Sequence, residues 1–445
     1  MPAFTEAEAR ALLERTLALS KAEGCEVQLQ GRRTGNIRFA RNTVSTSGAT
    51  DDADLVVASR FGKRVGTATI NEFSDEALSR VVRRAEELAR VAPEDPEVQP
   101  ILEPQTYAAS PAAFVEATNA IEPGLRAELA ARSIQEAKAK DAVAAGFLTD
   151  ERNWTAFLNS RGAFGYYRDT SATFAVTVRT ETGGGSGWAG ADVNDIARMD
   201  GAATARVAAE KAAASRESRA LEPGKYTVIL EPAASVDLLQ TILFNNGARE
   251  ADEGQSFLTK PGGGTKLGQK MVDERVTIYS DPAHPEVPVR PWDGEFLPRL
   301  RTAWIEKGIV RTLRCSRYWA AKQGQQPVAS PGNWIMEGGS QSLEELIRDT
   351  QKGILVTRTW YIRTVDPQTL LHTGLTRDGT FYVENGKIAY AVKNFRFNES
   401  PVIMLNNIDA LGKPERVQSA ETAGRVLAPP MRLRDFTFSS LSDAV

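Results

Sequence analysis

A single hydrophobic core stops growing at roughly 250–300 residues, and this chain has 445 residues. Its apolar side chains must therefore fill more than one core. Hydrophobic residues make up 42% of the chain and charged residues 25%, the ordinary mixture of a packed globular protein, so apolar material is not limiting. The sequence pattern changes near Glu222-Pro223-Gly224. We therefore predict two domains, residues 1–222 and residues 223–445.

The amino-terminal half has the pattern of an antiparallel sheet with flanking helices. Thr5 and Glu8 form a capping box before a leucine-rich helical pattern, and Ser74 precedes a second one. Alternating apolar residues between the two predict short strands. Prolines punctuate a connector near residues 92–123. The remaining helices and strands of this half are expected at residues 125–140, 154–158, 174–178 and 200–215.

The carboxy-terminal half has the pattern of mostly antiparallel strands joined by hairpins. A strand pattern at residues 226–231 is followed by an apolar helical pattern at residues 235–244. Asn385-Gly386 lies between two alternating patterns, and this dipeptide is the strongest short-range signal of a hairpin. The predicted fold class is therefore α+β, with an amino-terminal α/β domain and a carboxy-terminal β-rich domain.

Charge and composition exclude several classes of function. The net charge of −3 comes from 54 basic and 57 acidic residues mixed along the chain, so no basic stripe is available for nucleic acid. The first residues lack the basic leader and apolar run of a signal peptide, and no segment has the roughly 20 apolar residues of a membrane span. Cys25 and Cys315 form no CxxC pattern, which suits a reducing compartment. We expect a cytoplasmic protein with neither nucleic acid nor membrane as a partner.

No complete catalytic or metal-binding motif is present in the sequence. The only histidines, His284 and His372, are 88 positions apart and are interpreted as surface or turn residues. Glu250, Asp252 and Glu253 form a small acidic cluster, which is more typical of a solvated face than of a catalytic site. The glycine-rich stretch at residues 253–270 is too long for a simple connection, and such loops often act as lids or binding loops.

Short motifs spread over nearly the whole chain resemble the TldD/PmbA family, and specifically its PmbA (TldE-like) branch. Each motif is weak alone, whereas the ordered set is fairly specific. The motifs are GCEV at 24–27, NIRF at 36–39, FSDEAL at 73–78, NSRG at 159–162, GKYTVILEPAA at 224–234, EKG at 306–308, GILV at 353–356, DP at 366–367, VENGKI at 383–388 and LNNI at 405–408.

This resemblance implies an amino-terminal α/β domain and a carboxy-terminal β-rich, half-barrel-like domain, assembled as a dimer around an internal cavity. It also implies zinc-dependent cleavage of unfolded or unstructured peptides. In the TldD branch, a His-Glu-x-x-x-His helix and a cysteine near the carboxy terminus hold the zinc ion. Aligned through Leu238-Leu239, this sequence has Gln240 and Asn245 at the histidine positions and Thr241 at the glutamate position.

All of these functional positions depart from the zinc-binding pattern together. Carboxamides are weak ligands compared with imidazole, and a threonine cannot act as the general base. No cysteine follows Ile408. We therefore assign no catalytic, cofactor-binding or metal-binding residue to this chain, and we expect zinc only in a TldD-type partner.

Three hypotheses about function remain open. The first is a non-catalytic subunit of a TldD/TldE-type zinc metallopeptidase, paired with a TldD-type subunit and acting on unstructured peptides. The second is a self-sufficient homodimeric hydrolase that uses other groups, such as the cluster around Glu250. The third is a homodimer that binds peptides without cleaving them.

Overall fold

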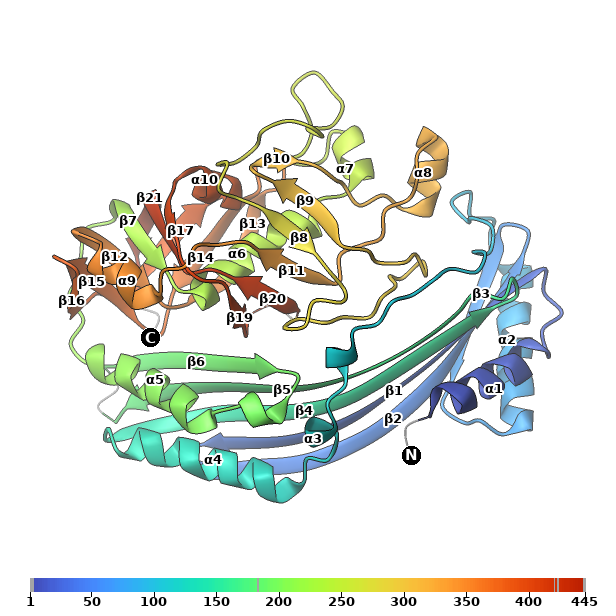
Figure 1. The fold of residues 1–445 in the computed structure, drawn as a ribbon, viewed down its shortest axis with the longest axis horizontal. Helices are drawn as coiled ribbons and strands as arrows, with labels where there is room; N and C mark the ends of the chain where they lie inside the picture. The colour runs from blue at the N-terminus through green and yellow to red at the C-terminus, as the bar shows by residue number, and fades with distance from the viewer. Residues whose placement is uncertain (1–3, 182–183, 420, 422–423, 443–445) are drawn as a thin grey trace.

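The computed structural model describes residues 4–181, 184–419, 421 and 424–442. A long, curved antiparallel sheet forms the lower layer of the molecule, and the carboxy-terminal half covers the inner face of this sheet (Figure 1). The predicted α+β class is confirmed. None of the helices in the described part of the chain is long and apolar enough to span a membrane.

The amino-terminal half builds a six-stranded sheet in the order β3-β2-β1-β4-β5-β6. Its strands are long rather than short: β1 and β2 have 17 and 19 residues. The strands are β1 (Gly24–Ala40), β2 (Thr43–Phe61), β3 (Arg64–Ile70), β4 (Ala142–Asn159), β5 (Phe164–Thr180) and β6 (Ser186–Val193). The helices are α1 (Glu6–Leu17), α2 (Asp75–Val91), η1 (Pro111–Ala113), α3 (Glu116–Asn119), α4 (Pro123–Lys138), η2 (Ile196–Arg198) and α5 (Gly201–Ala214).

Two pairs of helices cover the outer face of this sheet at its two ends (Figure 1). At one end, α1 and α2 pack on alternate residues of β1 such as Val27 and Leu29. At the other end, α4 and α5 pack on Ile37 and Phe39 of the same strand. The predicted capping box at Thr5 and the predicted N-cap at Ser74 are both present. Because successive side chains of a strand point to opposite faces, the residues between these apolar positions lie on the other face of the sheet, which the helices do not cover.

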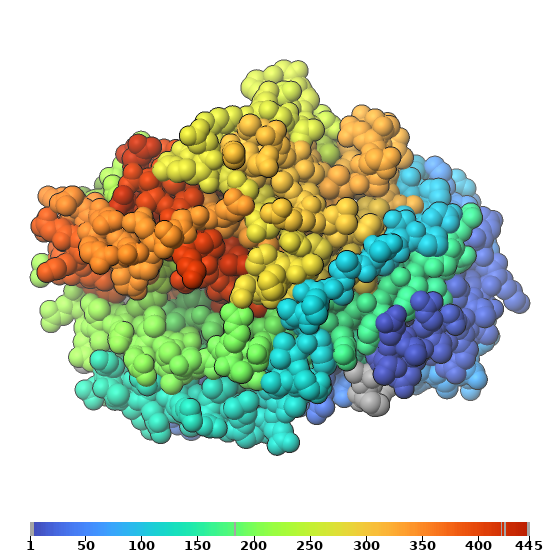
Figure 2. Space-filling model, viewed as in Figure 1, coloured from blue at the N-terminus to red at the C-terminus, as the bar shows by residue number. Residues whose placement is uncertain are grey.

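The connector near residues 92–123 runs along the surface, at the boundary between the two halves of the molecule (Figure 2). Glu97 forms an ion pair with Arg249 at 2.8 Å. The Tyr107 hydroxyl donates a hydrogen bond to the Phe296 carbonyl oxygen at 2.7 Å. This segment therefore joins the two halves as well as linking α2 to α4.

The carboxy-terminal half contains two further sheets, which curl into a half-barrel. Their orders are β10-β9-β8-β11-β20-β19 and β13-β14-β17-β21-β7-β12-β15-β16, with β18 paired to β21. Most pairs are antiparallel as predicted, whereas β7–β12 and β11–β20 are parallel. The strands are β7 (Gly224–Leu230), β8 (Ile278–Ser280), β9 (Thr302–Glu306), β10 (Ile309–Val310), β11 (Asn333–Met336), β12 (Lys352–Val356), β13 (Thr359–Asp366), β14 (Leu371–Thr376), β15 (Thr380–Glu384), β16 (Lys387–Ala391), β17 (Phe395–Glu399), β18 (Ile408–Leu411), β19 (Glu415–Val417), β20 (Arg425–Ala428) and β21 (Met431–Leu441).

An apolar helix lies in the core of this half. Helix α6 (Pro232–Phe244) buries Val236, Leu238, Leu239 and Ile242 against the surrounding strands. The predicted Asn385-Gly386 turn joins β15 to β16, and both of its residues have positive φ. The remaining helices of this half are α7 (Ala248–Asp252), α8 (Arg317–Gln323), α9 (Leu343–Arg348) and α10 (Pro401–Asn406).

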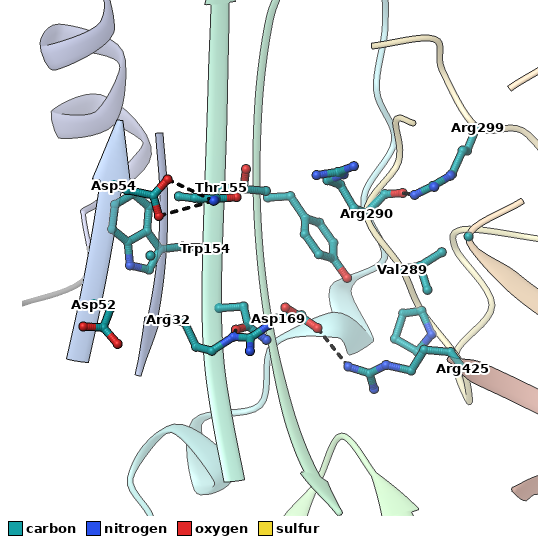
Figure 3. A pocket seen from close by; sticks show the side chains of 16 residues that line it. Arg32, Asp52, Asp54, Trp154, Thr155, Asp169, Val289, Arg290, Arg299 and Arg425 are labelled. Carbon is teal, nitrogen blue, oxygen red and sulfur yellow. Dashed lines mark hydrogen bonds and ion pairs between the residues drawn. The ribbon is translucent and has the colours of Figure 1, made fainter. Parts of the chain in front are cut away.

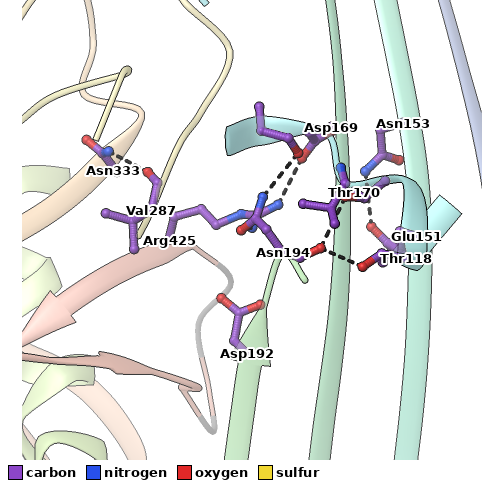
Figure 4. A network of polar contacts seen from close by, with 12 residues as sticks. Thr118, Glu151, Asn153, Asp169, Thr170, Asp192, Asn194, Val287, Asn333 and Arg425 are labelled. Carbon is purple, nitrogen blue, oxygen red and sulfur yellow. Dashed lines mark hydrogen bonds and ion pairs between the residues drawn. The ribbon is translucent and has the colours of Figure 1, made fainter. Parts of the chain in front are cut away.

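Aromatic and ionic contacts hold the two halves together. Phe157 of the first sheet stacks on Phe296 of the second half with ring centroids 4.1 Å apart. Arg425 forms an ion pair with Asp169 at 2.8 Å and also donates to Asn194, as Figure 4 shows. The Asn194 carbonyl oxygen accepts hydrogen bonds from the hydroxyl groups of two threonines of the first half, Thr118 and Thr170. We call these contacts, together with the Arg416–Asp192 pair, the inter-half network.

Helix α2 approaches β3 so closely that only glycine fits between them. A Cβ added at Gly66 would lie 2.1 Å from the backbone nitrogen of Ala89 and 2.3 Å from the carbonyl oxygen of Ala85. Gly66→Ala is therefore expected to lower the free energy of unfolding by about 1–3 kcal/mol, because the helix must shift. Gly124→Ala is the matched control, since a Cβ at Gly124 meets no atom within 4 Å. Urea denaturation would test the pair, and equal stability of the two variants would contradict this packing.

Candidate functional site

A cavity of about 510 Å³ lies between the inner face of the first sheet and loops of the carboxy-terminal half (Figure 3). We call it the central cleft. The sheet lines one side with polar residues from β1, β2, β4 and β5. The other side is lined by Pro288, Val289, Arg290, Arg299, Gly332 and Arg425. Its volume falls within the usual range for ligand sites.

The register of the first sheet explains why polar side chains meet on this face. Gln30 of β1 lies opposite both Asp54 of β2 and Thr155 of β4, and Thr155 lies opposite Tyr167 of β5. A second row is formed in the same way by Asp52, Arg32, Asn153 and Asp169. Residues paired across antiparallel strands share a face, so two polar rows cross four strands. The Gln30 amide donates to both Asp54 carboxylate oxygens, at 3.0 and 3.3 Å.

The loop side of the central cleft carries most of its positive charge. Burial lowers the pKa of Arg290, and burial together with the neighbouring Arg290 charge lowers the pKa of Arg299 to about 10. Both side chains therefore remain cationic at neutral pH. Burial raises the pKa of Asp169, and the Arg425 charge opposes that shift. The Arg425 guanidinium is accordingly compensated by Asp169, whereas Arg290 and Arg299 are not paired in this way.

The position of Gln240 adjoins the central cleft. Its side chain is 4% exposed and lines a second cavity of about 180 Å³, together with Leu243 and Phe244 of the same helix. Gly332 and Arg425 line both cavities. The structure therefore places Gln240, one of the three residues that the resemblance aligns with the zinc-binding positions, beside the central cleft.

The side chains of Thr241 and Asn245 form hydrogen bonds with the backbone of their own helix. The Thr241 hydroxyl donates to the Leu238 carbonyl oxygen at 2.6 Å. Asn245 is exposed at the end of α6, and its amide donates to the Thr241 carbonyl oxygen at 2.8 Å. An amide, a hydroxyl and a second amide arranged in this way do not fit a zinc ion, which prefers imidazole, thiolate and carboxylate ligands. Within residues 4–181, 184–419, 421 and 424–442, no three His, Cys, Asp or Glu side chains form a group that could hold a metal ion.

The acidic cluster on α7 does not act as one group. Glu250 lies 3.4 Å from Arg314, and Glu253 lies 3.2 Å from Arg249. The Asp252 carboxylate accepts a hydrogen bond from the Trp319 indole at 2.8 Å. Each carboxylate therefore has its own partner, as expected for side chains that stabilise the surface.

The two histidines lie on different elements of the carboxy-terminal half. His284 lies in a turn as predicted, where its Nδ1 accepts the Glu286 backbone N–H at 3.3 Å. The prediction was wrong for His372, which is buried in β14 between β13 and β17. Burial lowers the pKa of His372. The sequence around His372 has the alternation of a strand next to an Asp-Pro turn. This pattern does not reveal that β14 pairs with a strand on each side and that His372 is buried as a result.

The glycine-rich loop at residues 253–270 projects on the side of the carboxy-terminal half that faces away from the first sheet (Figure 1). Phe257 and Leu258 anchor its start in the core, while Gly262, Gly263 and Gly264 are exposed with positive φ. It lines neither cavity described above.

Because so little side-chain area fixes this glycine segment, limited proteolysis of the free chain by a protease of broad specificity is expected to begin between residues 259 and 270. Mass spectrometry of the first fragments would locate the cut. If the loop contacts a partner or a peptide, adding that molecule will slow the cut. An unchanged rate with both would contradict a binding role for the loop.

The residues of the central cleft were missed by sequence reasoning. The one available signal was the alternation of polar Gln28, Gln30 and Arg32 with apolar Val27 and Leu29. Such alternation distinguishes two faces of a strand. It does not distinguish a face turned to solvent from a face covered by a second half of the chain.

Comparison with known proteins identifies the family. Three models of the PmbA/TldA metallopeptidase match in succession: domain 1 at residues 25–89, the central domain at residues 113–216 and the C-terminal domain at residues 223–440. Metalloprotease PmbA of Escherichia coli O157:H7 is 25% identical over 433 residues, covering 94% of this chain and 93% of that protein.

Other relatives agree with this result. A metalloprotease of Methanothermobacter thermautotrophicus is 24% identical over 291 residues, which cover 60% of this chain and 62% of that protein. The crystal structure of TldE from Thermococcus kodakarensis has the same fold, with a TM-score of 0.86 and 18% identity over 97% of this chain and 99% of that one. The chain therefore belongs to the PmbA/TldD metallopeptidase family.

Proposed function

We propose that this chain is the non-catalytic subunit of a TldD/TldE-type zinc peptidase that acts on unfolded or unstructured peptides. In this proposal the chain binds the peptide in the central cleft, and a TldD-type partner supplies the zinc ion and the general base. The cytoplasm is the proposed location, because Cys25 and Cys315 are both free thiols buried in the fold.

The chemistry of α6 is the observation that carries this proposal. The family fold is complete along the chain, whereas Gln240, Thr241 and Asn245 occupy the positions that the resemblance assigns to the zinc-binding histidines and the catalytic glutamate. Thr241 and Asn245 also bond to the backbone of their own helix. An intact scaffold with a lost metal site is what a subunit needs when its partner performs the chemistry.

The central cleft supports the peptide-binding part of the proposal. An extended peptide exposes backbone N–H and C=O groups along its whole length, and the two polar rows offer both donors and acceptors to them. Gln30 and Asn153 carry carboxamides, and Thr155 carries a hydroxyl. Contacts to backbone groups suit substrates that differ in sequence.

The proposal predicts that the purified chain holds no stoichiometric zinc, because Gln240, Thr241 and Asn245 provide no imidazole, thiolate or carboxylate. Elemental analysis of protein folded in the presence of zinc and then dialysed would measure the ratio. A value well below one zinc per chain is expected. One zinc per chain, retained against a mild chelator, would contradict the proposal.

A further inference from the structure

Two arginines on the loop side of the central cleft are held by backbone groups and not by carboxylates. Arg290 Nε donates to the Trp292 carbonyl oxygen at 3.1 Å. Arg299 donates to the carbonyl oxygens of Ser330 and Arg290, at 2.9 and 3.0 Å. Among the described residues, no carboxylate lies within ion-pair distance of either guanidinium. Each arginine is thus oriented by the fold and retains N–H groups for another acceptor.

Asp293 is the acidic group whose charge acts on both arginines, and its carboxylate oxygens are already occupied. One oxygen accepts the backbone N–H groups of Glu295 and Leu297, at 2.9 and 3.0 Å. The other accepts the N–H of Ser330 at 3.0 Å. Asp293 therefore stabilises the loop and reduces the local positive potential. It accepts no hydrogen bond from the N–H groups of Arg290 or Arg299, which stay available to a ligand.

The Tyr167 hydroxyl adds a third donor to the same cavity. Tyr167 lines the central cleft and is only 5% exposed. Its hydroxyl is buried and has no hydrogen-bond partner among the described residues. Burial raises the pKa of Tyr167, so the group remains a protonated donor at physiological pH. A buried hydroxyl without an acceptor costs free energy, which an arriving acceptor would recover.

The charged side chains of the central cleft are distributed unequally between its two sides. Asp52 and Asp54 lie on β2 at the sheet side, whereas Arg290 and Arg299 lie on the loop side, as Figure 3 shows. Arg425 also lies on the loop side, and its charge is compensated by Asp169. A peptide in the cleft would therefore be attracted with a negative group toward the loops and repelled in the opposite orientation.

From this geometry we propose that Arg290, Arg299 and the Tyr167 hydroxyl bind a carboxylate of the peptide and so fix its position in the central cleft. Guanidinium groups match the planar, two-oxygen geometry of a carboxylate, and a tyrosine hydroxyl can donate to one of these oxygens. The carboxylate can be the carboxy terminus of the peptide or an acidic side chain. This inference rests on the proposed function, because it names the chemical class of the ligand in the same cleft.

Three fluorescently labelled unstructured peptides distinguish these sources, with affinity for the full chain measured by anisotropy. The first has a free carboxy terminus and no acidic residue, the second is the same peptide amidated, and the third is amidated with one internal glutamate. Capture of the carboxy terminus predicts that the first peptide binds about tenfold more tightly than the second, since hydrogen bonds to a charged carboxylate are stronger than those to a neutral amide. Capture of an acidic side chain predicts the same gain for the third peptide.

Variants test whether the higher affinity for a carboxylate arises at Arg290, Arg299 and Tyr167. Arg299→Gln and Tyr167→Phe are each expected to reduce the preference for a carboxylate severalfold while leaving binding of the amidated peptide unchanged. Tyr167→Phe removes only one oxygen atom, so it preserves the aromatic packing on Trp292. Arg301→Gln is the matched control, because it removes one positive charge from the same segment at an exposed position stacked on Tyr279. Arg301→Gln should leave all three affinities unchanged.

Different results would contradict carboxylate recognition and peptide binding. Equal affinity for all three peptides would overturn carboxylate recognition and leave peptide binding intact. A preference for carboxylate that survives both Arg299→Gln and Tyr167→Phe would place the anion elsewhere and also overturn this inference. No binding of any peptide would contradict the proposed function itself, and the inference with it.

Discussion

Arg416→Ala is expected to lower the free energy of unfolding by about 3–5 kcal/mol, because it leaves a buried carboxylate without its cation. Arg416 of β19 lies 2.8 Å from Asp192 of β6, and their side chains are 9% and 6% exposed. Arg416 also donates to the Glu286 carbonyl oxygen at 2.6 Å and to the Asn194 side chain. The substitution therefore removes one of the two arginines of the inter-half network.

Three further variants test whether the loss of stability arises because the ion pair is buried. Arg311→Ala breaks an ion pair with Glu306 of 3.0 Å whose side chains are 46% and 50% exposed, so it should cost no more than about 1 kcal/mol. Adding Asp192→Asn to an Arg416→Met variant should restore part of the loss, because neither charge then remains buried. Urea denaturation of these four variants and of the unsubstituted chain would provide the comparison. Equal losses for Arg416→Ala and Arg311→Ala would contradict a structural role for the network.

Local sequence signals predicted the elements that depend on local chemistry. The capping box at Thr5, the N-cap at Ser74 and the Asn385-Gly386 hairpin are all present. Each rests on hydrogen bonds or backbone angles set within a few residues. The apolar helix before Phe244 was predicted for a similar reason, since a helix buried on most of its surface has a sequence rich in apolar residues.

The length of the strands could not be predicted in the same way. The first part of β2, from Thr43 to Asp52, is exposed on both faces and includes Gly48. A propensity argument ends a strand there. The structure continues it, because β1 pairs with it along this stretch, with one shift of register between Arg38 and Phe39. Pairing between distant segments therefore overrides a weak local preference.

The central cleft could not be predicted, because four strands of the first sheet, two loops and the start of β20 bring its residues together. Asp52, Asn153 and Asp169 meet only when the register of the first sheet is known. Arg290 and Arg299 have no motif around them, and their positions depend on carbonyl oxygens that the fold supplies. The assignment of Gln240, Thr241 and Asn245 to a lost metal site, in contrast, stays a prediction from the resemblance, which aligns a single helix.

Peptide cleavage is expected to require a partner. The isolated chain should leave unstructured peptides intact, since binding and positioning alone provide no activated water. Adding a TldD-type zinc peptidase chain should raise the cleavage rate by about 10²-fold or more, because the partner supplies both the metal and the general base. The triple variant Gln240→His, Thr241→Glu, Asn245→His should remain nearly inactive alone, since no cysteine follows Ile408 to complete the ligand set and the three new side chains would lack evolved partners to orient them.

The acidic cluster provides the control for a hydrolase that works without a partner. Glu250→Ala combined with Asp252→Ala should leave the activity of the mixed assembly largely unchanged, because these carboxylates contact Arg314 and Trp319 and line neither cavity. A large loss of activity in this variant would indicate that the cluster takes part in the reaction.

The most direct measurement is the rate of cleavage of an unstructured fluorogenic peptide by the chain alone and by its mixture with a TldD-type partner, each with and without a chelator. The proposed function predicts no cleavage by the chain alone, cleavage by the mixture, and loss of that cleavage with the chelator. Chelator-resistant cleavage by the chain alone, abolished by Glu250→Ala, would contradict the subunit role and establish a self-sufficient hydrolase.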